Sequence, residues 1–190
     1  MSKVGTFLIL FSFIISATNV ISIIEPNEAQ IWVQNYMSQP KEKVATLHFY
    51  LQDDLSGPDA TVWEVARSEI TSNSSSAFGQ VSVLDDLVTT GPDRNSEKLG
   101  RAQGLVTSSD LKELSLATNI NIVFKAGKYN GSTISILGRN AITTAHRELP
   151  VVGGTGIFRM ARGFAITSTH SYDPVENYGV LEYTVYVFYV

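Results

Sequence analysis

Residues 130–156 read NGSTISILGRNAITTAHRELPVVGGTG, and this stretch decides how the fold is interpreted. Between Ser132 and Leu137, hydroxyl-bearing and aliphatic side chains alternate, which is typical of a β-strand with one polar and one apolar face. The stretch ends in the glycine-rich segment VVGGTG, which predicts a turn. Between the strand and the turn lies a cluster of polar residues: Arg139, Asn140, His146, Arg147 and Glu148.

Arg147 is the candidate binding group of this cluster. A guanidinium does not lose its proton, and its planar fork can hold a carboxylate or a developing phenolate oxygen at the mouth of an apolar pocket. Alternatively, Arg147 and Glu148 form only a solvated charge pair at a strand end. The residue types leave both interpretations open.

The alternation recurs along the chain. In residues 44–53 one row holds Ala45, Leu47, Phe49 and Leu51, and Asp53 falls in the same row, so its carboxyl group is expected on the apolar face. No later segment has an apolar stripe of helical length. The strand-like runs, separated by turn residues, are 44–53, 61–68, 78–89, 100–108, 114–124, 131–138, 157–171 and 179–189.

Eight antiparallel strands with short loops would leave two exposed edges unless the sheet closes on itself. We therefore predict an all-β fold, an eight-stranded antiparallel up-and-down barrel spanning residues 43–190. A barrel of this size either fills with side chains or holds one small ligand. We expect a cavity of aromatic or terpenoid size, rather than a sugar-binding groove. Its wall is expected to include Phe49, Leu51, Val81, Val83, Ile134 and Ile136, with Asp53, one of Asp85 and Asp86, and Arg147 as its polar groups.

Composition excludes several classes of function. The chain has 190 residues, enough for one domain, a net charge of −4, and no cluster of basic residues, so we expect no nucleic-acid partner. The absence of cysteine excludes disulfides and thiol catalysis. Three scattered histidines lack ligand spacing, and we expect neither a metal nor a cofactor.

The N-terminus predicts secretion. Lys3 precedes the apolar run FLILFSFII, which is only about half as long as a membrane-spanning helix needs to be. We therefore expect a signal peptide over residues 1–22, a flexible arm over 23–42, and no membrane partner. In a secreted chain, Asn73 and Asn130 stand in acceptor motifs for N-glycosylation.

Six ordered motifs resemble those of plant dirigent proteins, and the resemblance extends from Ala45 to Val190. The motifs are HFYLQD (48–53) with SGP (56–58), FG (78–79) with DD (85–86), GRAQG (100–104), FKAGKYNG (124–131), LGRN (137–140) and VVGGTG (151–156). The resemblance implies an allene-oxide-cyclase-like barrel that is secreted to the apoplast, glycosylated, and assembled as a dimer or trimer. The segment 180–190, apolar in both rows, suggests an outer face covered by another subunit.

The resemblance predicts one function, the guidance of radical coupling by a protein with no oxidative activity of its own, and two alternatives to it stay open. Members of the family guide the coupling of phenoxy radicals, which an external oxidase or laccase makes from a monolignol such as coniferyl alcohol, so that one stereoisomer forms. In a related branch, members act as lyases that close a ring through a quinone methide and give pterocarpans. The second alternative is a cell-wall barrel that binds a phenol without turnover.

The family's site residues carry over to Asp53, Asn140 and Arg147, with Phe49, Leu51, Asp86, Ile134 and Ile136 around the substrate. Lignan-forming members have an aspartate where this chain has Asn140, and an amide cannot donate a proton as an acid. The tyrosine that often follows GRAQG and the family's cysteine pair are also absent. The chain is therefore closer to the branch with GRN, which includes pterocarpan-forming members. Without the resemblance, a turn-capping role for Asp53 would be favoured.

Overall fold

The computed structural model describes residues 26–38 and 42–190, so the predicted signal peptide lies outside the described residues. In chain order the elements are α1 (Pro26–Ser38), β1 (Lys43–Asp54), β2 (Val62–Ala66), η1 (Glu69–Asn73), β3 (Val81–Thr89), β4 (Lys98–Ser108), β5 (Ser115–Phe124), η2 (Gly127–Tyr129), β6 (Thr133–Ala141), β7 (Arg147–Thr155), η3 (Gly156–Phe158), β8 (Arg162–Asp173) and β9 (Tyr178–Tyr189).

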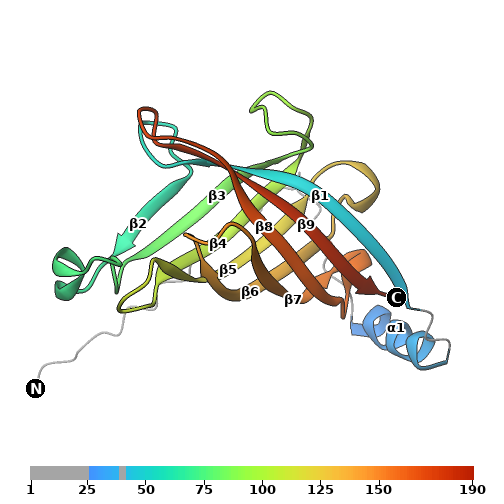
Figure 1. The fold of residues 1–190 in the computed structure, drawn as a ribbon. Coiled ribbons are helices and arrows are strands. Elements are labelled where there is room, and N and C mark those ends of the chain that lie inside the picture. The colour runs from blue at the N-terminus through green and yellow to red at the C-terminus, as the bar shows by residue number, and fades with distance from the viewer. Residues whose placement is uncertain (1–25, 39–41) are drawn as a thin grey trace, which may run out of the picture. The chain divides into compact units, whose positions relative to one another are not determined.

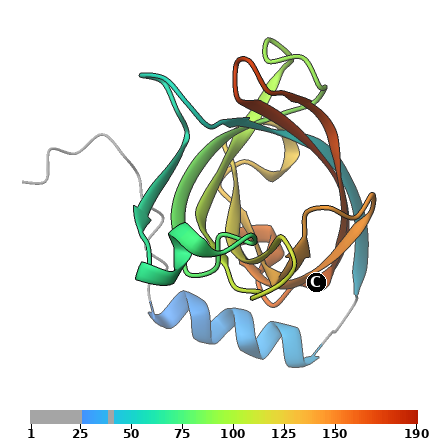
Figure 2. The same ribbon diagram turned by 60° about the vertical axis from the view of Figure 1, so that its left-hand side comes forward.

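The strands form a closed antiparallel barrel, which confirms the predicted fold class. The sheet order is β1-β9-β8-β7-β6-β5-β4-β3-β2, and β1 pairs with β3 as well, with Leu51 opposite Val88. Strands β1 and β3 to β9 therefore make an eight-stranded ring, which Figure 2 shows from a viewpoint close to the barrel axis. Every strand of this ring has two neighbours, so the ring has no free edge.

Strand β2 belongs to the sheet but not to the ring. It pairs with the first half of β3, from Val62 opposite Leu84 to Ala66 opposite Val81, whereas β1 pairs with the second half of β3. The run predicted at 61–68 is thus a strand that flanks the barrel at one end (Figure 1). Because β1 and β2 pair with different halves of β3, they separate from each other at the open end of the barrel.

Strand β7 takes the eighth place in the ring, and the sequence did not predict it. Residues 147–155 were assigned to a polar cluster and a glycine-rich turn, because Pro150, Gly153 and Gly154 are unusual inside a strand. A register irregularity between Ser135 and Ile136 of β6 accommodates this segment. The expected turn is therefore wrong, and Arg147 lies at the start of a strand.

Helix α1 was not predicted either, because its apolar residues do not form one stripe. Its start at Pro26 fits the preference of proline for the first helical turn, and Pro40 follows soon after its end. Helix α1 and the barrel are separate units of the structure. Within residues 26–38 and 42–190, no helix is long and apolar enough to span a bilayer.

One end of the barrel is filled and the other is not. The most deeply buried side chains include Phe49, Ile134, Ile136, Phe158 and Val187, which come from the start of β1, the end of β9 and the strands and turn beside them. Phe124, Tyr129 and Tyr189 pack around Phe158 at centroid distances of 4.8–5.8 Å. The opposite half, where β1 ends and β9 begins, is left for a cavity.

Gly104 of the GRAQG motif is required by close approach between strands. A Cβ atom built on Gly104 would lie 2.1 Å from the Asn119 carbonyl oxygen of β5. Because this oxygen belongs to the backbone, the strand itself would have to shift to remove the clash. We expect Gly104→Ala to lower the free energy of unfolding by about 2–4 kcal/mol, measured by urea denaturation. Gly153→Ala is the control, because a Cβ there meets nothing within 4 Å. Equal losses in both variants would contradict this explanation.

Candidate functional site

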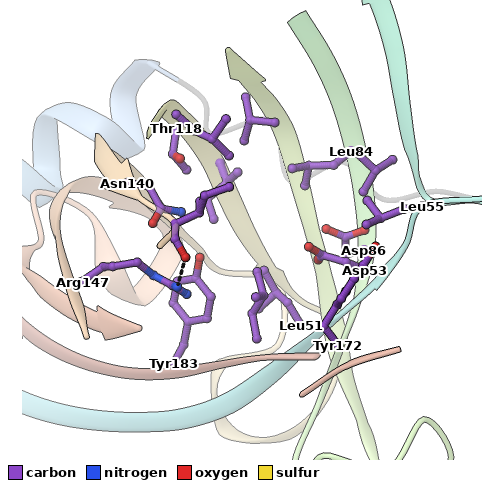
Figure 3. Close-up of a pocket in the computed structure, with 16 residues that line it drawn as sticks. Leu51, Asp53, Leu55, Leu84, Asp86, Thr118, Asn140, Arg147, Tyr172 and Tyr183 are labelled. Atoms are coloured by element: carbon purple, nitrogen blue, oxygen red, sulfur yellow. Dashed lines mark hydrogen bonds between the residues drawn. The ribbon is translucent and has the colours of Figure 1, made fainter. Parts of the chain in front are cut away.

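A cavity of about 300 Å³ occupies the unfilled end of the barrel, at the lower end of the range for ligand pockets. Sixteen residues line it, and Figure 3 shows them. Most are aliphatic, and the polar ones gather on two walls. They are Asp53 and Asp86 on one side, and Thr118, Asn140, Arg147 and Tyr183 on the other, with Tyr172 at the rim.

The two aspartates come from neighbouring strands. Asp53 follows Leu51 in the inward row of β1, as its position in the sequence predicts. On β3 the inward row is Ser82, Leu84, Asp86 and Val88. Asp85 points outward and accepts hydrogen bonds from Arg101 Nε at 2.8 Å and from Gln103 Nε2 at 3.1 Å.

Val81 and Val83 were expected inside and lie in the outward row of β3, where Val83 is 40% exposed. Both rows of this strand contain aliphatic residues, so the sequence pattern cannot say which row faces in. That part of the predicted wall is wrong, and Leu84 takes its place.

The carboxyl groups of Asp53 and Asp86 share a buried environment and face each other in Figure 3. Burial, and after it the negative charge of Asp53, raise the pKa of Asp86 to about 9. Burial also raises the pKa of Asp53 to about 6, against the opposing effects of its hydrogen bond with Asp86 and the charge of Arg147. Two close carboxylates resist carrying two charges, so the pair holds one proton at neutral pH.

Neighbouring groups fix the position of Asp86 and leave part of the pair unsatisfied. Thr61 Oγ1 donates a hydrogen bond of 2.5 Å to Asp86 Oδ1, and the Asp54 amide donates to Thr61 Oγ1 at 3.1 Å. Asp53 Oδ1 and Asp86 Oδ2 are buried and accept no hydrogen bond from a donor among the described residues. One shared proton between the two groups, or a ligand, satisfies them.

Arg147 reaches the cavity from the opposite wall. Only 5% of the residue is exposed, and its Nη1 donates to the Ile142 carbonyl at 3.2 Å and to Thr169 Oγ1 at 3.1 Å. Its Nε is buried without an acceptor. Burial lowers the pKa of Arg147, although a guanidinium remains charged at any physiological pH.

Further polar atoms without partners border the same space. Thr118 Oγ1 and Asn140 Oδ1 are buried and have no hydrogen bond among the described residues. Tyr183 stacks on Phe49 with a centroid distance of 5.7 Å, and burial raises the pKa of its phenol. Buried polar atoms are nearly always satisfied in folded proteins, so unpartnered atoms from five strands around one cavity indicate a polar ligand.

The structure separates the residues that the sequence grouped together. Leu51, Asp53, Asp86, Asn140 and Arg147 line the cavity. Phe49, Ile134 and Ile136 do not, because they are buried in the filled half. Alternation shows which side chains point inward but not at which height along the barrel they lie. Arg139, His146 and Glu148 are exposed outside, so the alternative pair of Arg147 with Glu148 does not form: the two side chains are on opposite faces of β7.

Three polar lining residues were missed, Thr118, Tyr172 and Tyr183, and so were most of the aliphatic ones. Tyr183 falls in the row of 180–190 that includes Val185 and Val187, and the parity of that row was the available signal. Thr118 gave no signal, because a threonine in a strand is most often a surface residue. Within the part of the chain that the structure describes, no group of three His, Cys, Asp or Glu side chains could hold a metal ion.

The carboxyl pair makes stability depend on pH. Both pKa values are raised by folding, so the folded state binds protons more tightly, and the stabilisation present near pH 4 is lost as the pH rises through about 6 and about 9. We expect the free energy of unfolding to fall between pH 5 and pH 9 by about 2 kcal/mol more in the native protein than in Asp86→Asn. Urea denaturation at pH 5, 7 and 9 measures this, and identical slopes in the two proteins would contradict it.

The chain is similar to one protein family, to several plant proteins and to solved structures. Residues 44–188 match a family described as "Dirigent-like protein". Dirigent protein 21 of Arabidopsis thaliana is 40% identical over 154 residues, which cover 81% of this chain and 82% of that protein. Pterocarpan synthase 1 of Glycyrrhiza echinata is 36% identical over 171 residues, or 90% and 91% of the two chains. The solved structure of the pterocarpan synthase dirigent protein GePTS1 matches with a TM-score of 0.72 and 39% identity, over 79% of this chain and 87% of that one.

Proposed function

Because the chain belongs to the dirigent family, we propose that its cavity binds a phenol and controls the stereochemistry of a reaction that passes through a quinone methide. The observation that carries this proposal is the carboxyl pair of Asp53 and Asp86, which holds a proton at neutral pH opposite Arg147. A quinone methide needs a proton or a hydrogen bond at one end and a fixed nucleophile at the other. The two walls of the cavity supply these groups.

The form of the reaction that the site supports best is a ring closure with loss of water. The carboxyl pair donates its proton to a leaving benzylic hydroxyl, the C–O bond breaks, and the substrate's phenol releases a proton as it becomes the quinone oxygen. A second phenolic hydroxyl then forms a C–O bond to the same carbon. Its proton returns to the carboxyl pair, and the quinone oxygen regains one from solvent. The sum is loss of one water with no oxidant.

Arg147 has a separate role in this proposal. Its buried Nε is positioned to donate a hydrogen bond to the oxygen that gains charge as the quinone methide forms and is consumed. The similarity to pterocarpan synthases, whose name describes such a product, supports the same form of the reaction.

Guided coupling of phenoxy radicals is the second candidate. A separate oxidase or laccase would supply radicals from a monolignol such as coniferyl alcohol, and the coupling product is again a quinone methide whose oxygen Arg147 could bind. This reaction does not require protonation of a leaving hydroxyl, so the raised pKa values of the carboxyl pair support it less directly.

Chiral chromatography of products distinguishes the candidates. The purified protein is given a racemic isoflavanol without oxidant in one reaction, and coniferyl alcohol with laccase in another. Ring-closed, enantiomerically enriched product in the first supports the lyase. Enantiomeric excess only in the second supports guided coupling. Racemic coupling together with untouched isoflavanol would contradict both, and would leave a barrel that binds without turnover.

We also propose that the protein is a homo-oligomer, but through a different face from the one expected. In the outward row of β9, Glu182, Thr184, Tyr186 and Phe188 are already partly buried. The exposed apolar side chains instead form one row across β2, β3, β4 and β6, in which the register aligns Trp63, Val83, Leu105, Asn119 and Leu137. Asn119 of β5 interrupts this row between Leu105 and Leu137, and exposed apolar surface on its two sides is typical of interfaces.

Leu105→Asp is expected to dissociate the oligomer, because it places a charge in the middle of that row. Light scattering after size-exclusion chromatography measures the mass. Leu111→Asp is the control, since Leu111 is an exposed leucine in the loop between β4 and β5. A wild-type monomer, or the same oligomer in both variants, would contradict the assignment of the face.

Secretion to the apoplast and N-glycosylation remain part of the proposal. Asn73 at the end of η1 and Asn130 after η2 are both exposed, as acceptor residues must be.

A further inference from the structure

A second cavity, of about 420 Å³, adjoins the first at the barrel mouth. The two cavities share four aliphatic residues, Leu55, Val62, Val106 and Leu116. The rest of the second lining is polar, and none of it takes part in the proposed reaction. Its polar residues are Glu64, Gln80, Ser82, Ser108 and Asn177.

The divergence of β2 from the ring produces this cavity. Ser82 of β3 is paired with Glu64 of β2 on one side and with Val106 of β4 on the other. Because β2, β3 and β4 reach the mouth of the barrel here, their inward side chains face the opening instead of packing in the core. Polar side chains in the inward rows of three adjacent strands therefore gather beside the reaction cavity.

Three of the five polar side chains in the second cavity have no partner among the described residues. The side chains of Gln80, Ser82 and Ser108 make no hydrogen bond to any described residue, although only 8% of Ser82 is exposed. Asn177 accepts a hydrogen bond from the Tyr172 hydroxyl at 2.6 Å, which leaves its amide N–H groups free. Two hydroxyls and two amides thus offer both donors and acceptors to a ligand.

The charges around the cavity favour a neutral, hydroxylated ligand. No lysine or arginine is in its lining, and its one charged group, Glu64, is paired with Arg67. A phosphate, sulfate or carboxylate would find no cation there and would be repelled by Glu64. A sugar ring presents hydroxyls that both donate and accept, together with apolar C–H faces, which match the polar side chains and the four shared aliphatic residues.

We propose that this second cavity is a glycosyl subsite, and that the substrate class is a phenol that carries a sugar on a hydroxyl other than the reacting one. The inference rests on the proposed function in that the phenol ring occupies the first cavity. The sugar lies at the mouth, against Gln80, Ser82 and Ser108, where it also fixes which face of the phenol meets the carboxyl pair.

Isothermal titration calorimetry tests this with a matched set of ligands. Coniferyl alcohol is compared with its glucoside on the side-chain hydroxyl, which leaves the phenol free. We expect the glucoside to bind at least about tenfold more tightly, as one or two net hydrogen bonds would give. In Gln80→Ala and Ser82→Ala, the affinity for the glucoside is expected to fall toward the affinity for coniferyl alcohol. The affinity for coniferyl alcohol itself is expected to stay unchanged.

Other outcomes separate this inference from the proposed function. Equal affinities for the two ligands in the native protein, or a gain that persists in both variants, would overturn the glycosyl subsite alone. Binding of two molecules of coniferyl alcohol per chain would also overturn it, because the second cavity would then hold a second phenol. A native protein that binds neither ligand would overturn the proposed function as well.

Discussion

Asp86→Asn is expected to lower kcat/KM for ring closure of an isoflavanol at least about 100-fold, the size of effect typical of a lost general acid. Asparagine keeps the shape of the side chain and can still accept the hydrogen bond from Thr61, but it cannot donate a proton as an acid. Asp53 does not replace the lost acid, because burial raises its pKa only to about 6 and it is mostly ionised at neutral pH.

Asp85→Asn is the matched control for this substitution. Asp85 is the adjacent residue on the same strand, but it points out of the barrel and pairs with Arg101. Its replacement should leave kcat/KM within about twofold of the native value. Urea denaturation of Asp86→Asn at the pH of the assay shows whether it is folded, and so separates unfolding from a loss of catalysis. Similar rates in the two variants would remove the carboxyl pair from the mechanism.

Arg147→Lys is expected to lower kcat about 100-fold, in the range seen when one donor to a developing oxyanion is removed. Lysine retains the positive charge but has no Nε donor at this position, so its single nitrogen would have to serve the ligand as well as the Ile142 carbonyl and Thr169, which Nη1 binds in the native protein. The loss should fall on kcat more than on KM, because the hydrogen bond strengthens as the oxygen gains charge.

Arg139→Lys controls for the change from guanidinium to ammonium. Arg139 is the arginine of the GRN motif, and its side chain is outside the barrel, where it pairs with Asp110 and Glu113. Its replacement should leave kcat unchanged. Thermal unfolding of both variants shows whether Arg147→Lys is folded, and a folded Arg147→Lys with native kcat would exclude Arg147 from the reaction.

The sequence predicted the architecture better than the strands that compose it. Alternation along 44–53 correctly placed Asp53 in the inward row, because one row of β1 is consistently apolar. It failed for β3, where Val83 belongs to an apolar row on the outside of the barrel. It also missed β7, which contains a proline and two glycines and has an extra residue, Val152, in its pairing with β6. These features depend on partners that no single strand encodes.

The sequence predicted the polar residues of the candidate site, but not how far along the barrel axis each inward side chain lies. The inward rows predicted a cavity with an aspartate and an arginine in its wall, yet Phe49 and Ile134 belong to the filled half. The height of each side chain follows from the register between strands, which the sequence does not state. The replacement of an expected acid by Asn140 suggested weak acid catalysis, whereas the structure provides a protonated pair on the opposite wall.

The proton on the carboxyl pair is the central claim, and infrared difference spectroscopy tests it most directly. Spectra of the native protein and of Asp86→Asn are compared at pH 7.5, between the pKa values of about 6 and about 9 that burial gives to the two groups. We predict a C=O stretching band of a protonated carboxyl group in the native protein, absent from the variant and lost from the native protein above pH 9. A native spectrum without that band at pH 7.5 would contradict the account.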